Sequence, residues 1–172
     1  MKISVPPTAC HVAAVTRPLL DQSLAEQGVS SGMVLFGIPS AGILFRCRAE
    51  GTILDLEFGA ILSALRFITH DLKEEKIQSV RILSSQPKLV FALYGRDFKA
   101  MKKEDDGALS LLVEYARQLA ISIEFVPPQR NLALLGVGDY PSMPEGRKLE
   151  VNPEWTISKM HQIKPIQTGV KL

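Results

Sequence analysis

Apolar residues recur at helical spacing between residues 52 and 72. They follow one another at steps of four and three, at Leu54, Phe58, Ile61, Leu65, Ile68 and Leu72. This period predicts an amphipathic helix with one buried face. Thr52 and Asp55 have the spacing of a capping box, with Asp in place of the usual Glu, so the helix is predicted to begin directly after Thr52. His70 falls on the polar side and is predicted to be exposed to solvent.

Shorter apolar segments predict β-strands. Between residues 43 and 50, Ile43, Phe45, Cys47 and Ala49 alternate with polar residues, which is typical of a strand with one buried face, although Leu44 breaks the alternation. A proline- and glycine-containing turn precedes this segment. Further strands are predicted at 11–16, 33–38, 79–83 and 121–126, and further helices at 88–94 and 107–119.

The order of these elements predicts an α/β fold. Three strands precede the first long helix, which indicates an antiparallel meander. The two later strands each follow a helix, which indicates parallel crossover connections. We therefore expect a mixed five-stranded sheet with helices packed on its faces.

The C-terminal part of the chain has a different composition. From residue 127 onward prolines arrive at short intervals and the apolar periodicity fades. We predict a domain over residues 10–136 and an extension over residues 137–172 that has no core of its own. The only tryptophan, Trp155, lies in this extension and is predicted to anchor it, either on its own domain or on a partner chain such as a second copy.

Length and composition narrow the choice of protein class. The chain has 172 residues, 46% of them hydrophobic and 22% charged, which suits one ordinary domain with a real core. Its 20 basic and 18 acidic residues give a net charge of +2, too small an excess to indicate nucleic-acid binding by itself. Two cysteines and three scattered histidines exclude a disulfide scaffold and a four-cysteine zinc site. Neither a signal peptide nor a membrane span is indicated, so a cytoplasmic location is expected.

Three segments, in this order and spacing, resemble the ribonuclease H-like superfamily, especially its compact prokaryotic members. The first is Thr52–Leu65, in which Glu57 precedes a run rich in Ala and Leu. The second is Val80–Gln86, which is similar to the family's fourth strand and the turn after it. The third is Ile123–Pro127, followed by Gln129, Arg130 and Asn131. The resemblance implies a ribonuclease H-like fold for residues 10–136.

The resemblance also implies an activity, which is phosphodiester hydrolysis by two divalent metal ions. Such ions must be held by several converging carboxylates. Family members take these from the first strand, the first helix, the fourth strand and the segment after the fifth. Here Glu57 matches the helix position and leans toward the buried face. The first-strand position falls near Ala14–Thr16, where no acid is present, the fourth-strand position is Ser84, and the last falls near Leu134 or Leu135, so the site is expected to be degenerate.

Two other activities stay open. The first is a divergent Mg²⁺- or Mn²⁺-dependent nuclease with a rearranged site around Glu57, to which Asp139 would contribute a second carboxylate. The second is binding of a small ligand or phosphate by Ser84, Ser85 and Gln86, which end a strand and open a helix, a common ligand position in α/β sheets.

Basic residues define candidate nucleic-acid contacts in two places. Two lie on the polar face of the third strand, and three follow the second helix: Arg46, Arg48, Lys99, Lys102 and Lys103. Acidic residues come directly after the second group, at 104–106, and balance its charge. A nucleic-acid role therefore has only weak support from the sequence.

The functional hypothesis that follows is a non-catalytic ribonuclease H-like binding or assembly module. No confident catalytic residue and no cofactor are expected, because one carboxylate cannot hold a pair of metal ions. The expected partner is a protein or a second copy of the chain, with nucleic acid as the less supported choice and no membrane contact.

Overall fold

The computed structural model describes residues 5–18, 30–98 and 107–136. The strands are β1 (Thr8–Pro18), β2 (Ser30–Ile38), β3 (Ile43–Gly51), β4 (Ser79–Ser84) and β5 (Ala120–Phe125). The α-helices are α2 (Ile53–His70), α3 (Pro87–Leu93) and α4 (Gly107–Ala116), and the 3-10 turns are η1 (Pro39–Ala41), η2 (Lys73–Glu75), η3 (Pro128–Arg130) and η4 (Leu132–Gly136). Every strand and α-helix lies where the sequence pattern predicted it, with its ends shifted by a few residues.

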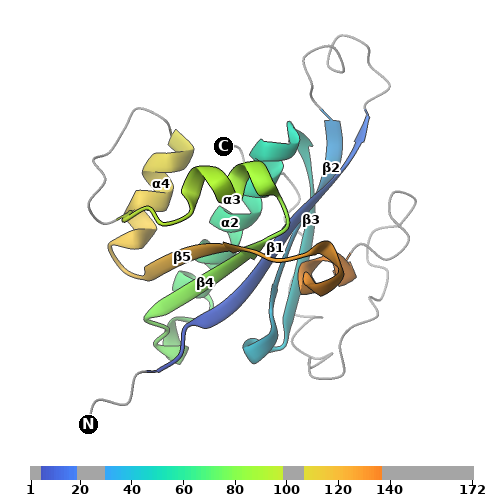
Figure 1. Cartoon of the computed structure of the whole chain (residues 1–172). Coiled ribbons are helices and arrows are strands. Elements are labelled where there is room, and N and C mark those ends of the chain that lie inside the picture. The colour runs from blue at the N-terminus through green and yellow to red at the C-terminus, as the bar shows by residue number, and fades with distance from the viewer. Residues whose placement is uncertain (1–4, 19–29, 99–106, 137–172) are drawn as a thin grey trace.

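The strands form one mixed sheet in the order β3-β2-β1-β4-β5 (Figure 1). β1 pairs antiparallel with β2, and β2 pairs antiparallel with β3. On its other side β1 pairs parallel with β4, and β4 pairs parallel with β5. The predicted meander followed by parallel crossovers is therefore confirmed, and the first strand of the chain lies in the centre of the sheet.

Local sequence signals set the ends of the elements. Gly42 closes the turn between β2 and β3 with a left-handed backbone (φ 66°), a conformation that glycine adopts without steric cost. At the start of α2 the Thr52 side chain accepts a hydrogen bond from the Asp55 N–H, and the Asp55 carboxylate accepts one from the Thr52 N–H. This confirms the predicted capping box. His70, at the other end of α2, is exposed as predicted.

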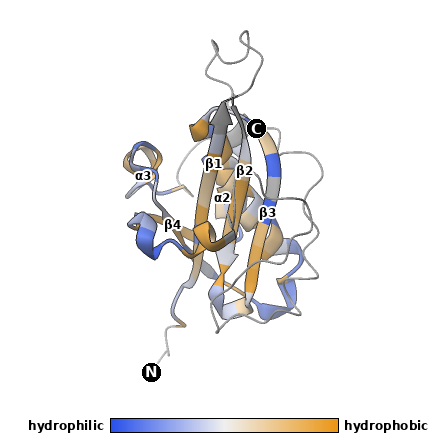
Figure 2. Ribbon diagram, turned by 90° about the vertical axis from the view of Figure 1, so that its right-hand side faces the viewer, coloured by the Kyte–Doolittle hydropathy of each residue, from blue (hydrophilic) through white to orange (hydrophobic). Residues whose placement is uncertain are grey.

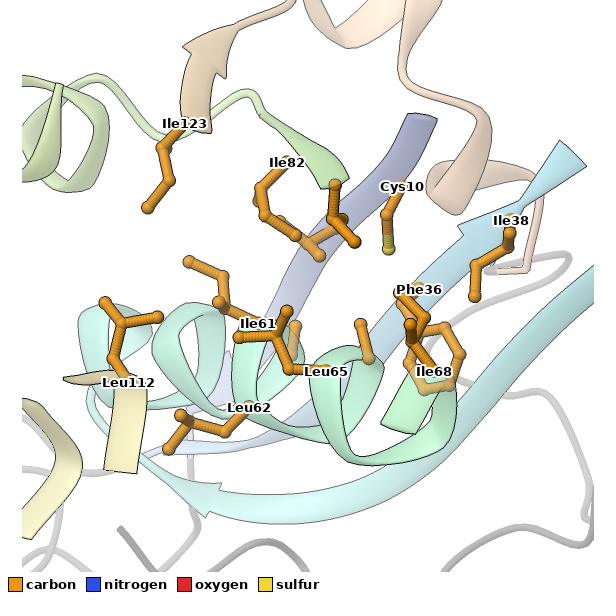
Figure 3. Packing of buried hydrophobic residues seen from close by; sticks show 14 of the residues in the cluster. Cys10, Phe36, Ile38, Ile61, Leu62, Leu65, Ile68, Ile82, Leu112 and Ile123 are labelled. Carbon is orange, nitrogen blue, oxygen red and sulfur yellow. The ribbon is translucent and has the colours of Figure 1, made fainter. Parts of the chain in front are cut away.

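The main core lies between the sheet and the helices. Figure 3 shows Ile61, Leu65 and Ile68 of α2 pointing toward Ile82 and Phe36 of the sheet. Phe36 stacks on Phe45 of the neighbouring strand, with ring centroids 4.6 Å apart. Burial of one apolar face of α2 against several strands stabilises the helix far more than its intrinsic propensity does.

A smaller apolar cluster covers the opposite face of the sheet. It contains Ala13, Met33, Leu35 and Ala133, and it forms where η4 packs across the central strands (Figure 1). This second cover explains why Leu44 breaks the alternation in β3: the side chain is buried, although its neighbours in β3 face α2. Figure 2 shows that β3 changes from hydrophobic positions at one end to hydrophilic ones toward the other.

None of the described helices is long and apolar enough to cross a lipid bilayer.

Candidate functional site

A buried glutamate lies at the end of β4, beside β1. Glu57, in the first turns of α2, is only 3% exposed. Its Oε1 accepts a hydrogen bond of 2.8 Å from the Ser84 hydroxyl at the end of β4. The carboxylate also accepts a hydrogen bond from the backbone N–H of Ala14 in β1. The inward lean predicted for Glu57 is thus confirmed.

The ends of the strands create the space for this carboxylate. β4 pairs with β1 only from Thr8↔Val80 to Val12↔Ser84, whereas β1 continues to Pro18 alongside β2. Beyond Val12 the β4 side of β1 therefore has a backbone N–H, that of Ala14, for Glu57 to bind. The carboxylate occupies the corner left by the shorter strand.

Burial changes the acidity of Glu57. Loss of water raises the pKa of this carboxyl from 4.5 to about 7, because the charged form is the one that needs solvent. The hydrogen bonds from Ser84 and Ala14 act in the opposite direction and offset only part of this effect. Near neutral pH the side chain is therefore a mixture of carboxylate and neutral acid.

Ser84 connects this glutamate to the start of α3. Its side chain is fully buried, and its Oγ accepts a hydrogen bond of 3.0 Å from the Gln86 N–H while donating to Glu57. Gln86 in turn accepts a bond from the Lys88 N–H and caps α3. The proposed ligand contacts Ser84 and Gln86 therefore have these internal partners, and their ligand-binding role stays a prediction.

A second set of hydrogen bonds joins the segment after β5 to β1 and to the residue that follows β4. The Nδ2 of Asn131, a buried residue after η3, donates to the Val12 carbonyl (2.9 Å) and to the Ser85 hydroxyl (3.0 Å). Its Oδ1 accepts a bond from the Ala133 N–H, and Ser85 donates to the carbonyl of Val126. We call Glu57, Ser84, Ser85, Gln86 and Asn131 the strand-end cluster.

His11 fastens the segment after β5 to the opposite face of the sheet. Its Nδ1 accepts a hydrogen bond of 3.2 Å from the Leu132 N–H. Burial, with a smaller contribution from the charge of Arg81, lowers the pKa of His11 to about 4, so the ring is neutral at ordinary pH. Cys10 packs into the main core instead, where burial raises its thiol pKa. The two neighbours thus point to opposite faces and form no Cys–His pair.

The other predicted site residues lie outside the strand-end cluster. Arg46 and Arg48 are on β3, the edge strand separated from β1 by β2. Asp139, Trp155 and the three lysines of the 99–103 segment lie outside the described residues, so their roles stay predictions. The sequence interpretation missed the hydrogen bonds of Asn131, in the strand-end cluster, and of His11, on the opposite face of the sheet, because each joins residues about 120 positions apart.

The strand-end cluster contains one acidic residue, Glu57. Within residues 5–18, 30–98 and 107–136, no group of three or more His, Cys, Asp or Glu side chains is placed to hold a metal ion. The groups that bond to Glu57, the Ser84 hydroxyl and the Ala14 N–H, are not carboxylates. The arrangement supports hydrogen bonding and proton uptake by Glu57.

The sheet has the mixed antiparallel and parallel pairing that the order of the elements predicted, with β1 at its centre. Solved structures similar to it include the N-terminal RNase H domain of Rv2228c from Mycobacterium tuberculosis, solved as a fusion with maltose binding protein (14% identity over 73% of this chain and 85% of that one, TM-score 0.44). RNase H1 from Halobacterium salinarum is similar at 15% identity over 74% of this chain and 91% of that one, with a TM-score of 0.43. LC11-RNase H1 in complex with an RNA/DNA hybrid is similar at 13% identity over 72% of this chain and 87% of that one, with a TM-score of 0.47. Neither a protein-family model nor a curated protein sequence matches the chain.

Proposed function

We propose that this chain is a non-catalytic ribonuclease H-like module that binds a partner instead of cleaving nucleic acid. The observation that supports it is the environment of Glu57. This carboxylate is buried, carries hydrogen bonds from Ser84 and Ala14, and is partly protonated near pH 7. Two-metal hydrolysis needs several ionised carboxylates around a pair of cations, and a serine hydroxyl and a methyl group do not supply them.

The number of carboxylates limits metal binding. A hard cation such as Mg²⁺ prefers several ionised oxygen ligands, and one carboxylate holds a single cation weakly at best. The rearranged nuclease that would add Asp139 to Glu57 is the competing proposal, and it predicts metal-dependent cleavage.

Cleavage and metal binding in the full-length protein test this proposal. We expect no metal-dependent hydrolysis of a labelled RNA–DNA hybrid with Mg²⁺ or Mn²⁺. We also expect these ions to shift the melting temperature of the wild type no more than that of Glu57→Gln. The matched control is Glu75→Gln, which removes an exposed glutamate in η2. Cleavage that requires metal and is lost in Glu57→Gln but kept in Glu75→Gln would overturn the proposal.

A further inference from the structure

One face of the sheet is only partly covered by the described elements. α2 packs on the other face, where its apolar side chains join Val34 and Phe36 in the main core. On the partly covered face, η4 contacts β1, β2 and β3, and we call this side of the three strands the η4 face. Beside the smaller cluster, Val15 and Leu134 are only half-buried, and Leu135 of η4 is 41% exposed. Apolar side chains therefore stay open to a further covering segment here.

Two arginines of β3 border these apolar side chains. In the pairing of β2 with β3, Arg46 lies opposite Leu35 and Arg48 lies opposite Met33, and both partners belong to the smaller cluster. Residues directly opposite each other in an antiparallel pair share one side of the sheet, so both arginines are on the η4 face. Glu50 is the acid of β3 on the same side. The hydrophilic positions of β3 in Figure 2 thus add a positive charge to this face.

β3 is also an edge of the sheet. In the order β3-β2-β1-β4-β5, no described strand pairs with the outer side of β3. The strand has nine residues and buries Phe45 and Ala49, so this edge is long and partly apolar. Natural proteins cover such edges with a helix or a loop, because an open edge pairs with other chains. The edge therefore calls for a segment that lies across β3.

The chain itself continues from this face. Gly136, at the end of η4, lies so close to the sheet that a Cβ atom there would be 2.7 Å from Leu35 Cδ2. Residues 137–172 follow directly. Asp139 comes three positions after Gly136, and three extended residues span about 10 Å, or roughly two strand spacings. The start of the extension is therefore within reach of both arginines of β3.

The charge of the extension matches the η4 face in its first half. Between residues 137 and 154 four acids outnumber two bases, namely Asp139, Glu145, Glu150 and Glu154 against Arg147 and Lys148. From Trp155 to the C-terminus the chain contains no acid. The acidic half is thus the one joined to η4. Because it is tethered, its effective concentration at this face is about millimolar, far above that of a second copy in dilute solution.

We propose that residues 137–155 dock on the η4 face of their own chain. The acids of this segment pair with Arg46 and Arg48, and Trp155 covers the open apolar side chains beside η4. Docking in this way protects the edge of β3 and assigns its two arginines to the extension and not to nucleic acid. It goes beyond the proposed non-catalytic function and does not depend on it.

Fluorescence of Trp155, the only tryptophan, reports this docking in the full-length protein. We expect its emission to lie at a shorter wavelength than in urea, and we expect acrylamide to quench it less. The variant Arg46→Glu/Arg48→Glu should shift both quantities toward their values in urea, and rising salt should act in the same direction. Adding Asp139→Arg/Glu145→Arg to that variant should restore the wild-type values, because the ion pairs form again with reversed signs.

The matched control is Lys73→Glu/Arg117→Glu, which reverses two exposed cations on η2 and after α4. It should leave the emission of Trp155 unchanged, and circular dichroism should show every variant folded. Wild-type emission and quenching equal to those in urea overturn the inference. Emission that Arg46→Glu/Arg48→Glu leaves unchanged, or that the charge swap does not restore, overturns it as well.

Dilution separates this docking from self-association. Trp155 emission and molar mass in light scattering should both stay constant as the protein is diluted. Emission that moves to longer wavelength while an oligomer dissociates overturns the inference and assigns the η4 face to a second copy. Metal-dependent cleavage, by contrast, overturns the proposed function and leaves the docking of the extension standing.

Discussion

Glu57 should make the stability of the protein depend on pH in an unusual direction for a carboxylic acid. Its pKa is about 7 in the folded state and 4.5 without burial. The folded state therefore binds the proton more tightly than the unfolded state does. The stabilisation from protonated Glu57 is complete below pH 4.5, and it is lost as the pH rises from 4.5 through 7.

The size of the effect follows from the two pKa values. One pKa unit corresponds to ~1.4 kcal/mol, so the interval from 4.5 to about 7 corresponds to ~3 kcal/mol. Glutamine resembles the protonated acid in shape and charge but does not titrate. In the variant the Ser84 oxygen can accept a hydrogen bond from the side-chain amide at position 57, in addition to the one from the Gln86 N–H, because a hydroxyl oxygen has two acceptor sites and its proton can rotate away. The Glu57→Gln variant should therefore fold normally.

Urea denaturation of wild type and Glu57→Gln at pH values from 4.5 to 8 measures this effect. The free energy of unfolding of the variant, minus that of the wild type, should rise by about 3 kcal/mol across this range. Taking the difference removes the contributions of other titrating groups, including His11. In thermal melts the same change corresponds to a gain of roughly 10 °C for the variant at pH 8.

The matched control Glu75→Gln alters an exposed glutamate and should leave the difference from wild type constant with pH. A difference between wild type and Glu57→Gln that stays flat from pH 4.5 to 8 would refute the reasoning. It would mean that the carboxylate is solvated in the folded protein. A difference that falls with rising pH would indicate a stabilised carboxylate, as expected for a metal ligand.

Three further predictions concern the contacts around the strand-end cluster and the start of α2. Asn131→Ala should lower the free energy of unfolding by about 3 kcal/mol in urea, because it removes three hydrogen bonds and leaves the buried Val12 carbonyl and Ala133 N–H without their partner, whereas Gln129→Ala, in an exposed position, should have little effect. Thr52→Ala should cost ~1 kcal/mol through loss of the helix cap, and Thr52→Ser should restore stability. The pKa of His11 is lowered to about 4, so its neutral ring contributes stability above pH 6.5 that is lost as the pH falls toward 4. In His11→Asn the free energy of unfolding should therefore fall less steeply between pH 6.5 and 4 than in the wild type. An equally steep fall in both proteins would contradict this.

The sequence predicts the elements well because their signals are local. The helix 53–70 is defined by its apolar period and by a capping box four residues long. β3 is defined by alternation, and the one position that departs from it, Leu44, is explained by η4. The order of strands and helices then restricts the possible sheet pairings, because parallel strands need crossovers while antiparallel ones do not.

The site is only half predictable, because its remaining contacts are non-local. Glu57 is recognisable from its place at the rim of the apolar stripe, and Ser84 from the end of its strand. Asn131 gives no comparable signal, since it lies in a loop and its partner Val12 is 119 residues away in sequence. The raised pKa of Glu57 also depends on how completely the surrounding strands exclude water, which no sequence pattern reports.

The position of β1 has a consequence for how the chain is completed during translation. Among the described strands β1 is made before the others, yet it forms the middle of the sheet, so the edge that pairs with β4 has no partner until residues 79–84 have left the ribosome. The carbonyl of Val12 gains its hydrogen bond from Asn131 only after that residue has also left the ribosome. A nascent chain that stalls before residue 79 therefore presents an open, apolar strand edge to its neighbours, which is the arrangement most prone to aggregation.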